Sequence, residues 1–562
     1  MCTALAASIG MNRKVWVAGS MGPTSKSLSL SPDVADPAFR PYSFDEMSAA
    51  YRQQAEALIK GGADILLVET CFDALNVKAA LSAIQELGDI PVMISVSVGD
   101  RSGRTLTGQT LEAFYTSVRH FPIISFGLNC SLGASELTPL MEDLGTWCSC
   151  AVSCYPNAGL PNEMGGYDQS PEEMGSQVLA MASKGLVNIV GGCCGTTPDH
   201  IRAIAKAVKG TKPHAIPQKN NDRILTVSGL EAVAIDVKRN NFTNVGERTN
   251  VAGSRKFARL ISEGKYDEAL QIAAKQIEDG ASIIDINMDD AMLDSTKEMA
   301  RFVRYISNDP GVAKAALMID SSHWETILAG LHNSPGKGIV NSVSLKEGEA
   351  EFLRKAREIR ALGAAIIVMA FDEQGQAVTY SRKIEICQRA FNLLVKEAGF
   401  EPNDIIFDVN ILAIGTGIEE HDNYAVDFIK AVKWIKENLK GAKTSGGVSN
   451  LSFSFRGNNT VREAMHSVFL YHAIAAGLDM AIVNPSMLQV YDQIEPQLLR
   501  RVEAVVLNDI SILGEEAAGY ANATEALIEL AQHIKEQEIA AKEAGAAGGA
   551  VQQAKQQWRE GS

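Results

Sequence analysis

The chain has 562 residues, enough for about two to four domains that each bury a core of their own. Its formal charge of −15 argues against nucleic acid or an anionic membrane as a partner, because both select clustered Lys and Arg. No window approaches the roughly 18 to 20 apolar residues of a membrane helix, and the first residues lack the features of a secretory signal, so we expect a cytoplasmic protein with reduced cysteines.

Short apolar runs alternate with segments of helical periodicity along most of the chain, a pattern typical of βα units and a parallel sheet. Residues 51–70 show one such unit, in which a Gly61-Gly62 pair ends a helix and a buried strand follows that ends at Glu69. The first part of the chain contains six predicted strands, at residues 15–20, 65–70, 92–98, 123–129, 151–155 and 187–190.

A second series of predicted strands follows a polar, proline-containing stretch at residues 212–222. These strands lie at residues 243–245, 283–287, 316–320, 338–342, 365–370, 405–408, 445–448 and 480–483. A closed (β/α)8 barrel needs eight strands. The sequence therefore predicts an α/β protein with two tandem TIM-type (β/α)8 barrels, of which the second is complete and the first lacks its first two strands.

This count divides the chain into four parts. We expect an incomplete first barrel over residues 1–211, a linker over 212–238, a complete second barrel over 239–508 and a helical tail over 509–562. The tail is rich in Ala, Glu, Gln and Lys, and glycines interrupt it near its end.

Three cysteines stand at predicted strand ends of the first barrel. Cys130 ends one apolar run, and Cys193 and Cys194 follow another. Because the C-terminal strand ends of a barrel meet on one face, the three thiols are expected to converge. Three thiolates would bind zinc and leave a fourth tetrahedral position for water or a substrate thiol. The alternative, that these cysteines only pack at strand ends, ignores their common placement.

Polar side chains also stand at every strand end of the second series, which predicts a ligand pocket at the mouth of that barrel. Carboxylates and amides together can pair with a flat heterocycle that offers both donors and acceptors, such as a reduced pterin. A specific glycine-rich phosphate motif is missing from the sequence, which disfavours a nicotinamide or ATP enzyme. The strand-end residues are Glu247, Asn287, Asp320, Asn341, Asp372, Asp408, Asn450 and Asn484.

Several strings in the sequence resemble known families. Asn129-Cys130, together with the Gly-Gly-Cys-Cys-Gly-Thr-Thr string at residues 191–197, resembles the zinc signature of the homocysteine methyltransferase family. Five further strings resemble the pterin-binding barrel of cobalamin-dependent methionine synthases, a family that carries both barrels in this order. They lie at residues 244–250, 285–289, 320–322, 369–377 and 452–458.

For the first barrel, the resemblance implies that Cys130, Cys193 and Cys194 hold zinc and that homocysteine binds this zinc as its thiolate. Metal coordination lowers the pKa of a thiol and so supplies a strong nucleophile at neutral pH. Glu69 matches a position expected to hold the amino group of homocysteine, and Asn157 matches an oxygen donor near the open zinc position.

For the second barrel, the resemblance implies a pocket for the pterin of 5-methyltetrahydrofolate, with cob(I)alamin as the methyl acceptor. N5 of the pterin must be protonated or strongly hydrogen-bonded before tetrahydrofolate can leave. We expect Asn450 to make the hydrogen bond to N5, and Asp320 and Asp408 to recognise the ring, so that Asn450 and Asp320 are the expected catalytic residues. The implied folate contacts are Gly253, Ser254, Arg255, Asp320, Asn341, Asp408, Asn450 and Arg456.

The sequence departs from the resembled family at both ends. The family's first strand, with its acidic substrate contact, has no counterpart before Val15, and we therefore expect a truncated sequence with an impaired first barrel. The Asp-x-His-x-x-Gly cobalamin motif does not occur, so cobalamin is expected on a module outside this chain.

These observations predict a methyltransferase of methionine synthesis that supplies the homocysteine and folate domains. One alternative is a methyltetrahydrofolate:corrinoid-protein methyltransferase with a non-functional first barrel, and another is a non-catalytic fragment that binds folate or zinc. A dihydropteroate-synthase-like activity is compatible with the second barrel alone, but it would leave the cysteines of the first unexplained.

Overall fold

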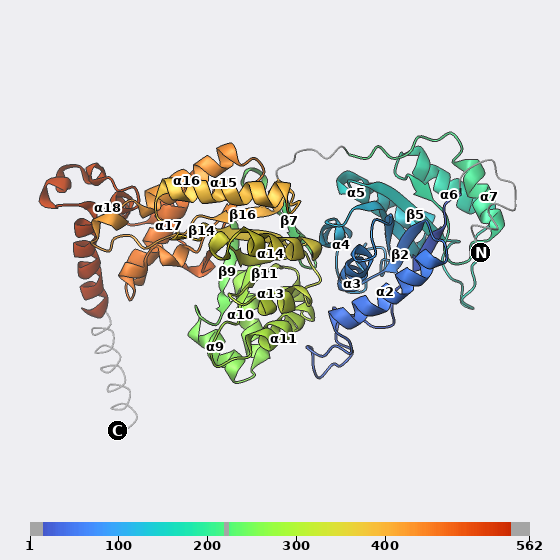
Figure 1. Ribbon diagram of the computed structural model, residues 1–562, viewed down its shortest axis with the longest axis horizontal. Coiled ribbons are helices and arrows are strands. Elements are labelled where there is room, and N and C mark those ends of the chain that lie inside the picture. Colours follow the sequence, from blue (N-terminus) through green and yellow to red (C-terminus); the bar gives the residue numbers. More distant parts are fainter. Residues whose placement is uncertain (1–14, 218–223, 541–562) are drawn as a thin grey trace, which may run out of the picture.

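The computed structural model describes residues 15–217 and 224–540. Two parallel sheets follow each other along the chain, and helices surround each of them (Figure 1). Every strand expected from the alternating pattern is present, within a few residues of its predicted bounds. The predicted α/β architecture is confirmed: the described residues form one six-stranded parallel sheet and one eight-stranded parallel barrel.

The first sheet contains six parallel strands in the described part of the chain, and neighbours in sequence are neighbours in the sheet. Its strands are β1 (Ala18–Met21), β2 (Ile65–Cys71), β3 (Val92–Val96), β4 (Ile123–Gly133), β5 (Ala151–Asn157) and β6 (Ile189–Val190). Its helices are α2 (Phe44–Lys60), α3 (Ala74–Gln85), α4 (Leu111–Val118), α5 (Ala134–Trp147), α6 (Pro171–Ser183) and α7 (Pro198–Ala207).

The bounds of these helices follow capping chemistry. Helix α2 begins with a reciprocal pair of hydrogen bonds between Ser43 and Glu46, and α6 begins with the same pair between Ser170 and Glu173. Helix α2 stops before Gly62, whose φ of 90° lies in the left-handed region that glycine adopts without strain. These local signals place each helix so that its apolar face covers the sheet.

The second sheet is an eight-stranded parallel barrel in which β18 returns to pair with β9. Its strands are β9 (Thr243–Asn250), β10 (Ile283–Asn287), β11 (Ala316–Asp320), β12 (Ile339–Val343), β13 (Ala365–Met369), β16 (Ile405–Asp408), β17 (Lys443–Ser445) and β18 (Met480–Val483). A small antiparallel pair, β14 (Phe371–Asp372) and β15 (Gly375–Gln376), follows β13.

Helices alternate with these strands and form the outer layer of the barrel (Figure 1). They are α9 (Arg255–Ser262), α10 (Tyr266–Glu278), α11 (Ser295–Ser307), α12 (Pro310–Ala313), α13 (Trp324–Leu331), α14 (Glu349–Ala361), α15 (Tyr380–Lys396), α16 (Tyr424–Asn438), α17 (Asn459–Ala476) and α18 (Pro496–Val506). Short 3-10 helices are η1 (Leu345–Glu347), η2 (Pro402–Asp404), η3 (Glu419–His421), η4 (Val448–Asn450), η5 (Phe453–Phe455), η6 (Pro485–Met487), η7 (Tyr491–Gln493) and η8 (Ile510–Gly519).

The barrel closes between β17 and β18 through few backbone contacts. The N–H of Ile482 donates to the carbonyl of Gly446 at 3.0 Å, and Gly447 forms an isolated parallel bridge with Ile482. A Cβ atom at Gly446 would lie 2.6 Å from Cδ1 of Ile411, so only glycine lets the Ile411 side chain pack this closely against the backbone of residue 446. This seam therefore depends on additional contacts for its stability.

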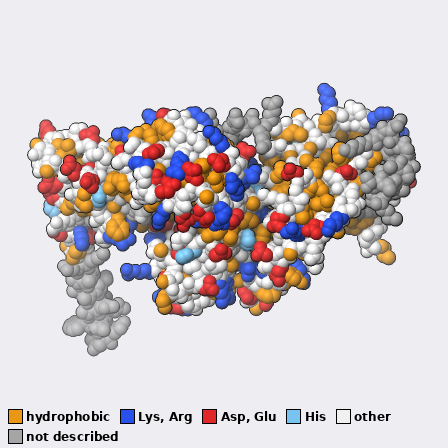
Figure 2. All heavy atoms as spheres, in the orientation of Figure 1, with side chains coloured by type: hydrophobic (Ala, Val, Ile, Leu, Met, Phe, Trp, Pro, Cys, Tyr) orange, Lys and Arg blue, Asp and Glu red, His pale blue; other side chains and the backbone are white. Residues whose placement is uncertain are grey.

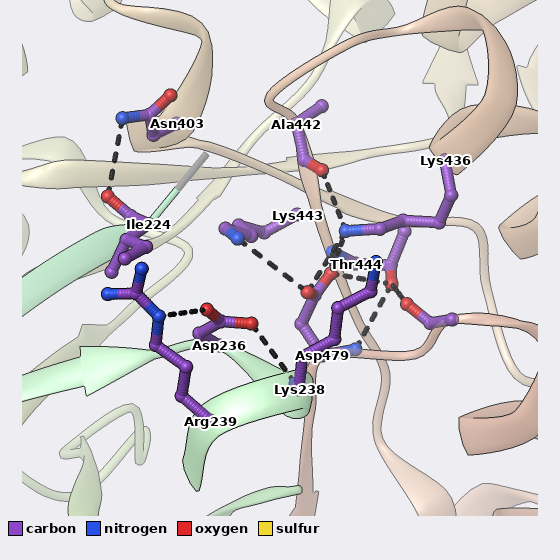
Figure 3. A network of polar contacts seen from close by, with 11 residues as sticks. Ile224, Asp236, Lys238, Arg239, Asn403, Lys436, Ala442, Lys443, Thr444 and Asp479 are labelled. Carbon is purple, nitrogen blue, oxygen red and sulfur yellow. Dashed lines mark hydrogen bonds and ion pairs between the residues drawn. The ribbon is translucent and has the colours of Figure 1, made fainter. Parts of the chain in front are cut away.

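A buried carboxylate supplies such contacts at the N-terminal end of the seam (Figure 3). Asp479, which precedes β18, accepts hydrogen bonds from Nζ of Lys436 at 2.8 and 3.0 Å and from the N–H of Thr444 at 2.8 Å. The Nζ atom of Lys443 lies 3.8 Å from the same carboxylate. Asp479 thus ties α16 and β17 to the start of β18.

An antiparallel hairpin lies within the stretch that the sequence assigns to the linker. It consists of β7 (Leu225–Ser228) and β8 (Ala232–Ile235), and the short helix α8 (Val237–Asn240) follows it. Leu225, Val227 and Ile235 pack into the apolar interior of the second barrel, against strand residues such as Ile283 and Met318. The hairpin therefore plugs the N-terminal end of this barrel.

The turn of the same hairpin contacts both domains. The carbonyl of Leu230 accepts from the N–H of Thr110 at 3.0 Å, and its own N–H donates to the carbonyl of Ala313 at 2.7 Å. Nearby, Nζ of the buried Lys78 donates to the carbonyl of Ser334 at 3.2 Å. These partners in the second barrel all precede strands, so the first domain docks at the N-terminal end of the second barrel.

A C-terminal helix packs on the second barrel. It covers residues 523–540, and the side chains of Arg501 and Asn458 donate to the carbonyls of Ala526 and Ala531. The rest of the predicted tail, residues 541–562, and the first residues of the predicted first barrel, 1–14, lie outside the described residues. Within the described ranges, each helix is too short or too polar to cross a membrane.

Acidic and basic side chains are interspersed on the face of the second barrel that Figure 2 shows. On α14, Arg354 lies between Glu351 and Glu358, and on α15, Arg389 pairs with Glu373. Such exposed pairs contribute little to stability, at most about 1 kcal/mol each. The fold therefore depends mainly on burial and on buried contacts such as those of Asp479.

The Asp479→Asn variant should destabilise the second barrel by about 3 kcal/mol, because it removes the carboxylate that accepts hydrogen bonds from Lys436 and Thr444 at the seam. Urea titration followed by tryptophan fluorescence measures this change. The matched control is Asp279→Asn, which removes an exposed ion pair with Lys275 and should change the free energy of unfolding by less than about 0.5 kcal/mol. Equal effects of the two substitutions would contradict a special role for Asp479 at the seam.

Candidate functional site

The three predicted cysteines converge at the C-terminal rim of the first sheet. Cys130 lies within β4, and Cys193 and Cys194 follow β6 after two glycines. Their sulfur atoms all lie within 4.8 Å of one another, and the Sγ atoms of Cys130 and Cys194 are 3.6 Å apart. Sulfur atoms about 2.3 Å from one tetrahedral zinc ion are about 3.8 Å from each other, so this spacing fits one ion.

The backbone around Cys130 is held in a conformation that non-glycine residues seldom adopt. Cys130 and Ser131 have φ angles of 62° and 60°, and Thr70 near the end of β2 has 57°. Residues in the left-handed region cost about 1 to 2 kcal/mol each and persist only where surrounding contacts hold them. In this backbone conformation, the Cys130 thiol lies beside the other two thiols.

Asn129 supplies the contacts that hold this rim. It is 1% exposed, and its Oδ1 accepts from the N–H of Thr70 at 3.0 Å and from the hydroxyl of Ser95 at 2.7 Å. Its Nδ2 donates to the hydroxyl of Thr70 at 2.8 Å and lies 3.7 Å from Sγ of Cys193. The sequence marks Asn129 only as the neighbour of Cys130; its positioning role comes from contacts across three strands.

The electrostatics of the cluster favour a bound cation. Burial and the neighbouring thiols Cys130 and Cys194 raise the pKa of Cys193 to about 12, although the amide of Asn129 opposes this rise. Three thiolates would repel one another without a positive charge between them, and a divalent ion reverses that balance. Sulfur ligands in this number and spacing suit zinc among the common metals.

Glu69 and Asn157 lie on the same rim. The carboxylate of Glu69 on β2 accepts a hydrogen bond from the hydroxyl of Ser20 on β1. Oδ1 of Asn157, at the end of β5, accepts from the backbone N–H of Cys194 at 3.1 Å. Asn157 therefore supports the turn that carries two of the thiols, while the roles of both residues toward homocysteine remain predictions.

A second polar cluster lies at the C-terminal end of the second barrel. Asn287, Asp320 and Asn341 are register neighbours on β10, β11 and β12, and Asn250 on β9 is paired with Asn287. Across the barrel, Asp408 on β16 is in register with Met369 and Ser445. The carboxylates and amides at this level lie above an apolar interior, and we call them the ring: Asn250, Asn287, Asp320, Asn341 and Asp408.

Burial weakens the acidity of both predicted ring-binding carboxyls. It raises the pKa of Asp320 to about 7, with a further rise from the charge of Asp289 and an opposing hydrogen bond from Asn287. It also raises the pKa of Asp408 to about 6, although the N–H of Asn410 and the charge of Lys383 favour the ionised form. Protonation of these carboxyls therefore changes close to neutral pH.

Lys383 on α15 positions the loop that carries Asp408. Its ammonium group is fully buried and donates to the carbonyls of Ala377 at 3.2 Å, Asn410 at 3.1 Å and Val409. The N–H of Asn410 in turn donates to Oδ1 of Asp408 at 2.8 Å. The sequence analysis missed Lys383, although a lysine on the apolar face of a predicted helix is a usable signal.

The remaining predicted folate contacts lie around the mouth of the barrel. Gly253 donates its N–H to Oδ1 of Asn250 at 3.1 Å, and Ser254 caps the N-terminus of α9, where Arg255 is exposed. Asn450 is exposed in η4, and the guanidinium of Arg456 lies 3.9 Å above the Phe453 ring. The structure places all five near the strand ends but outside the inner ring.

Three of the strand-end residues have local partners. The carboxylate of Asp372 is buried against Arg382, and the amide of Asn484 caps η6. Glu247 accepts from the hydroxyl of Ser449 at 2.9 Å, which links β9 to the loop of Asn450. Asp372 and Asn484 thus stabilise the adjoining loops. In the sequence they stand at strand ends just as the ring residues do, so the sequence alone could not distinguish the two groups.

Two family models match successive parts of the chain. Residues 2–208 match the model described as homocysteine S-methyltransferase, and residues 246–484 match the model described as pterin binding enzyme. The first match contains the cysteine cluster, and the second contains the carboxylate and amide ring.

Solved structures similar to this chain include the homocysteine methyltransferase MmuM from Escherichia coli. Its apo form has 22% sequence identity and a TM-score of 0.29, and the match covers 37% of this chain and 67% of that one. Its metallated form has 23% identity, a TM-score of 0.28 and coverage of 36% and 65%, so this chain spans about two thirds of the MmuM length. A dihydropteroate synthase from Xanthomonas albilineans has 14% identity, a TM-score of 0.34 and coverage of 52% and 98%. By the two family models, the chain combines a homocysteine S-methyltransferase domain with a pterin-binding domain.

Proposed function

We propose that this chain supplies the two substrate domains of a cobalamin-dependent methionine synthase. The overall reaction moves a methyl group from 5-methyltetrahydrofolate to the thiolate of homocysteine. The observation that carries the proposal is the convergence of three thiols within 4.8 Å at the rim of a homocysteine S-methyltransferase domain. The largely half-buried ring of carboxylates and amides in the adjoining pterin-binding domain supports the same reaction.

In the first domain, Cys130, Cys193 and Cys194 would hold zinc. When bound, the ion would lower the pKa of the homocysteine thiol and so supply a thiolate at neutral pH. Asn129 orients this ligand set through its contacts with Thr70, Ser95 and Cys193. Glu69 would hold the amino group of the substrate, and Asn157 would offer its amide near the open side of the cluster.

In the second domain, Asp320, Asn341 and Asp408 would bind the edges of the pterin ring, and Asn450 would donate a hydrogen bond to N5. That bond matters because the electron pair of the breaking N5–CH3 bond stays on nitrogen, and a proton or a strong donor must accommodate it. Gly253, Ser254, Arg255 and Arg456 would contact the parts of the folate that leave the barrel mouth. Cobalamin, held by a module outside this chain, would carry the methyl group between the domains.

A second candidate function uses only the pterin-binding domain, as a methyltetrahydrofolate:corrinoid-protein methyltransferase. The observation that favours it is the strand count: the second sheet closes with eight strands, whereas the first has six in the described residues. A chain that binds folate and zinc without transferring a methyl group is the third outcome of the experiment below.

Transfer of labelled methyl from 5-methyltetrahydrofolate to added cob(I)alamin tests the pterin-binding domain, and later addition of homocysteine tests the first. We expect both steps, the second at a reduced rate because the first sheet has six strands in the described residues, and about one zinc ion per chain in the same preparation. Methyl transfer to cobalamin without methionine would select the second candidate. Failure of both steps in folded protein would reject the catalytic proposal and leave the binding function.

The Cys193→Ser variant should lose zinc, because a hydroxyl is a much poorer zinc ligand than a thiolate. We expect its affinity for zinc to fall by more than about 100-fold, since even residues that only support ligands cost about 10- to 100-fold. Metal analysis after dialysis against a chelator of known affinity measures the change. The control is Cys150→Ser, a half-buried cysteine outside the cluster, which should retain its zinc.

The Asn450→Ala variant should slow methyl transfer to cobalamin while leaving folate binding nearly unchanged, because the hydrogen bond to N5 strengthens only as the methyl group leaves. Loss of such a donor costs about 100- to 1000-fold in rate. Single-turnover transfer and equilibrium binding of 5-methyltetrahydrofolate separate the two effects. Asn438→Ala, at the exposed end of α16, is the control; a parallel loss of binding and rate in N450A would instead give Asn450 a binding role.

A further inference from the structure

A carboxyl group that the proposed function does not use lies beneath the pterin pocket. Asp285 is the third residue of β10, where it shares the inward face with Ile283 and Asn287. It is in register with Met318, one step deeper in the barrel than the Asn287–Asp320 pair. Ile283 and Met318 belong to the apolar interior, and Asp285 is 1% exposed. An acid at this depth needs a partner or a proton.

The partner that the structure provides is shared with Asp320. Nδ2 of Asn250 lies 3.3 Å from Oδ2 of Asp285 and 3.3 Å from Oδ2 of Asp320. Oδ1 of Asp285 has no hydrogen-bond partner among the described residues. One amide nitrogen thus bridges two buried carboxyls, and an oxygen of the deeper one stays unpaired.

The charges that face this pair are negative. Glu247 on β9 acts on Asp285, and Asp289 in the loop after β10 acts on Asp320. Two side chains, those of Asn250 on β9 and Asn341 on β12, counteract the rise in the pKa of Asp285, and both are neutral amides. Among the described residues, no lysine or arginine forms an ion pair with either carboxyl of the pair; Lys383 acts on Asp408, across the barrel.

Two neighbouring carboxyls without a cation do not both ionise, so the pair keeps one proton. The more deeply buried of the two carboxyls holds this proton, because burial disfavours the ionised form. Burial, the charge of Asp320 and that of Glu247 raise the pKa of Asp285 well above its ordinary value, whereas the pKa of Asp320 rises to about 7. Near and above neutral pH, the proton therefore stays on Asp285.

We propose that Asp285 is a positioning residue of the pterin pocket, whose retained proton leaves Asp320 as the ionised member of this carboxyl pair, facing the ligand. This inference rests on the proposed function and deepens it by specifying the ligand edge. An ionised Asp320 accepts hydrogen bonds, so it selects a flat heterocycle that presents adjacent N–H donors, as the amino-pyrimidine edge of a pterin does. Asp285 contributes no proton to the reaction.

The protonated state of Asp285 can be tested without any ligand. Infrared difference spectra at about pH 8 between the wild-type chain and the Asp285→Asn variant should contain the C=O band of a carboxylic acid, which the variant loses. The Asp320→Asn variant should keep that band. A missing band in the wild type, or a band that persists in D285N, would overturn the proposal. Asp285→Ser replaces D285N in this comparison if the latter does not fold.

Binding of 5-methyltetrahydrofolate supplies the second readout. In the wild type, affinity should fall up to about tenfold per pH unit below a midpoint near 7, because Asp320 must be ionised to bind the ring. D285N is neutral and of the same shape as protonated Asp285, so it should keep both the affinity, within about threefold, and the midpoint. Asp285→Ala should weaken binding by more than about tenfold, because Asn250 loses an acceptor.

A midpoint that moves down by a pH unit or more in D285N would overturn the proposal, since it would show that Asp285 is ionised and repels Asp320. Equal binding by D285A and D285N would also overturn it, since Asp285 would then position nothing. If the wild type binds no 5-methyltetrahydrofolate at all, the proposed function of this domain fails, and the infrared comparison still decides the protonation of Asp285.

Discussion

The parallel direction of the strands is the constraint on which both candidate sites depend. In each sheet the C-terminal strand ends meet on one rim, so residues far apart in sequence become neighbours. Cys130 and Cys194 come from strands separated by a whole βα unit, yet their sulfur atoms are 3.6 Å apart. In the second barrel, the same constraint aligns Asn287, Asp320 and Asn341 on three successive strands.

In the second barrel, the contacts that stabilise the fold lie at the N-terminal end and the candidate site lies at the C-terminal end. At the N-terminal end, the β7–β8 hairpin fills the interior with apolar side chains, and Asp479 pins the seam between β17 and β18. At the C-terminal end, buried carboxyls and the Lys383 ammonium carry a desolvation cost that only dense local hydrogen bonding offsets. The strained backbone at Cys130 is held in the same way, by the amide network of Asn129.

The contact between the domains leaves the rim of the second barrel uncovered. The first domain meets the hairpin turn at Leu230 and the segments that precede β11 and β12, all at the N-terminal end. The thiols lie on the rim of a different sheet, so the proposed methyl transfer between the two sites needs a carrier that reaches both.

Periodicity and turn residues act over short distances, so the amino-acid sequence alone was enough to predict the two series of strands and the cysteines at the strand ends. It did not show the hairpin in the expected linker, whose strands are short and gain stability only by filling the barrel. Only the tertiary structure separated Asp372, which is bound by Arg382, from the inward Asp320 and Asp408. It alone paired Asp285 with Asp320 through Asn250, since that contact joins three strands and no pattern along one strand encodes it.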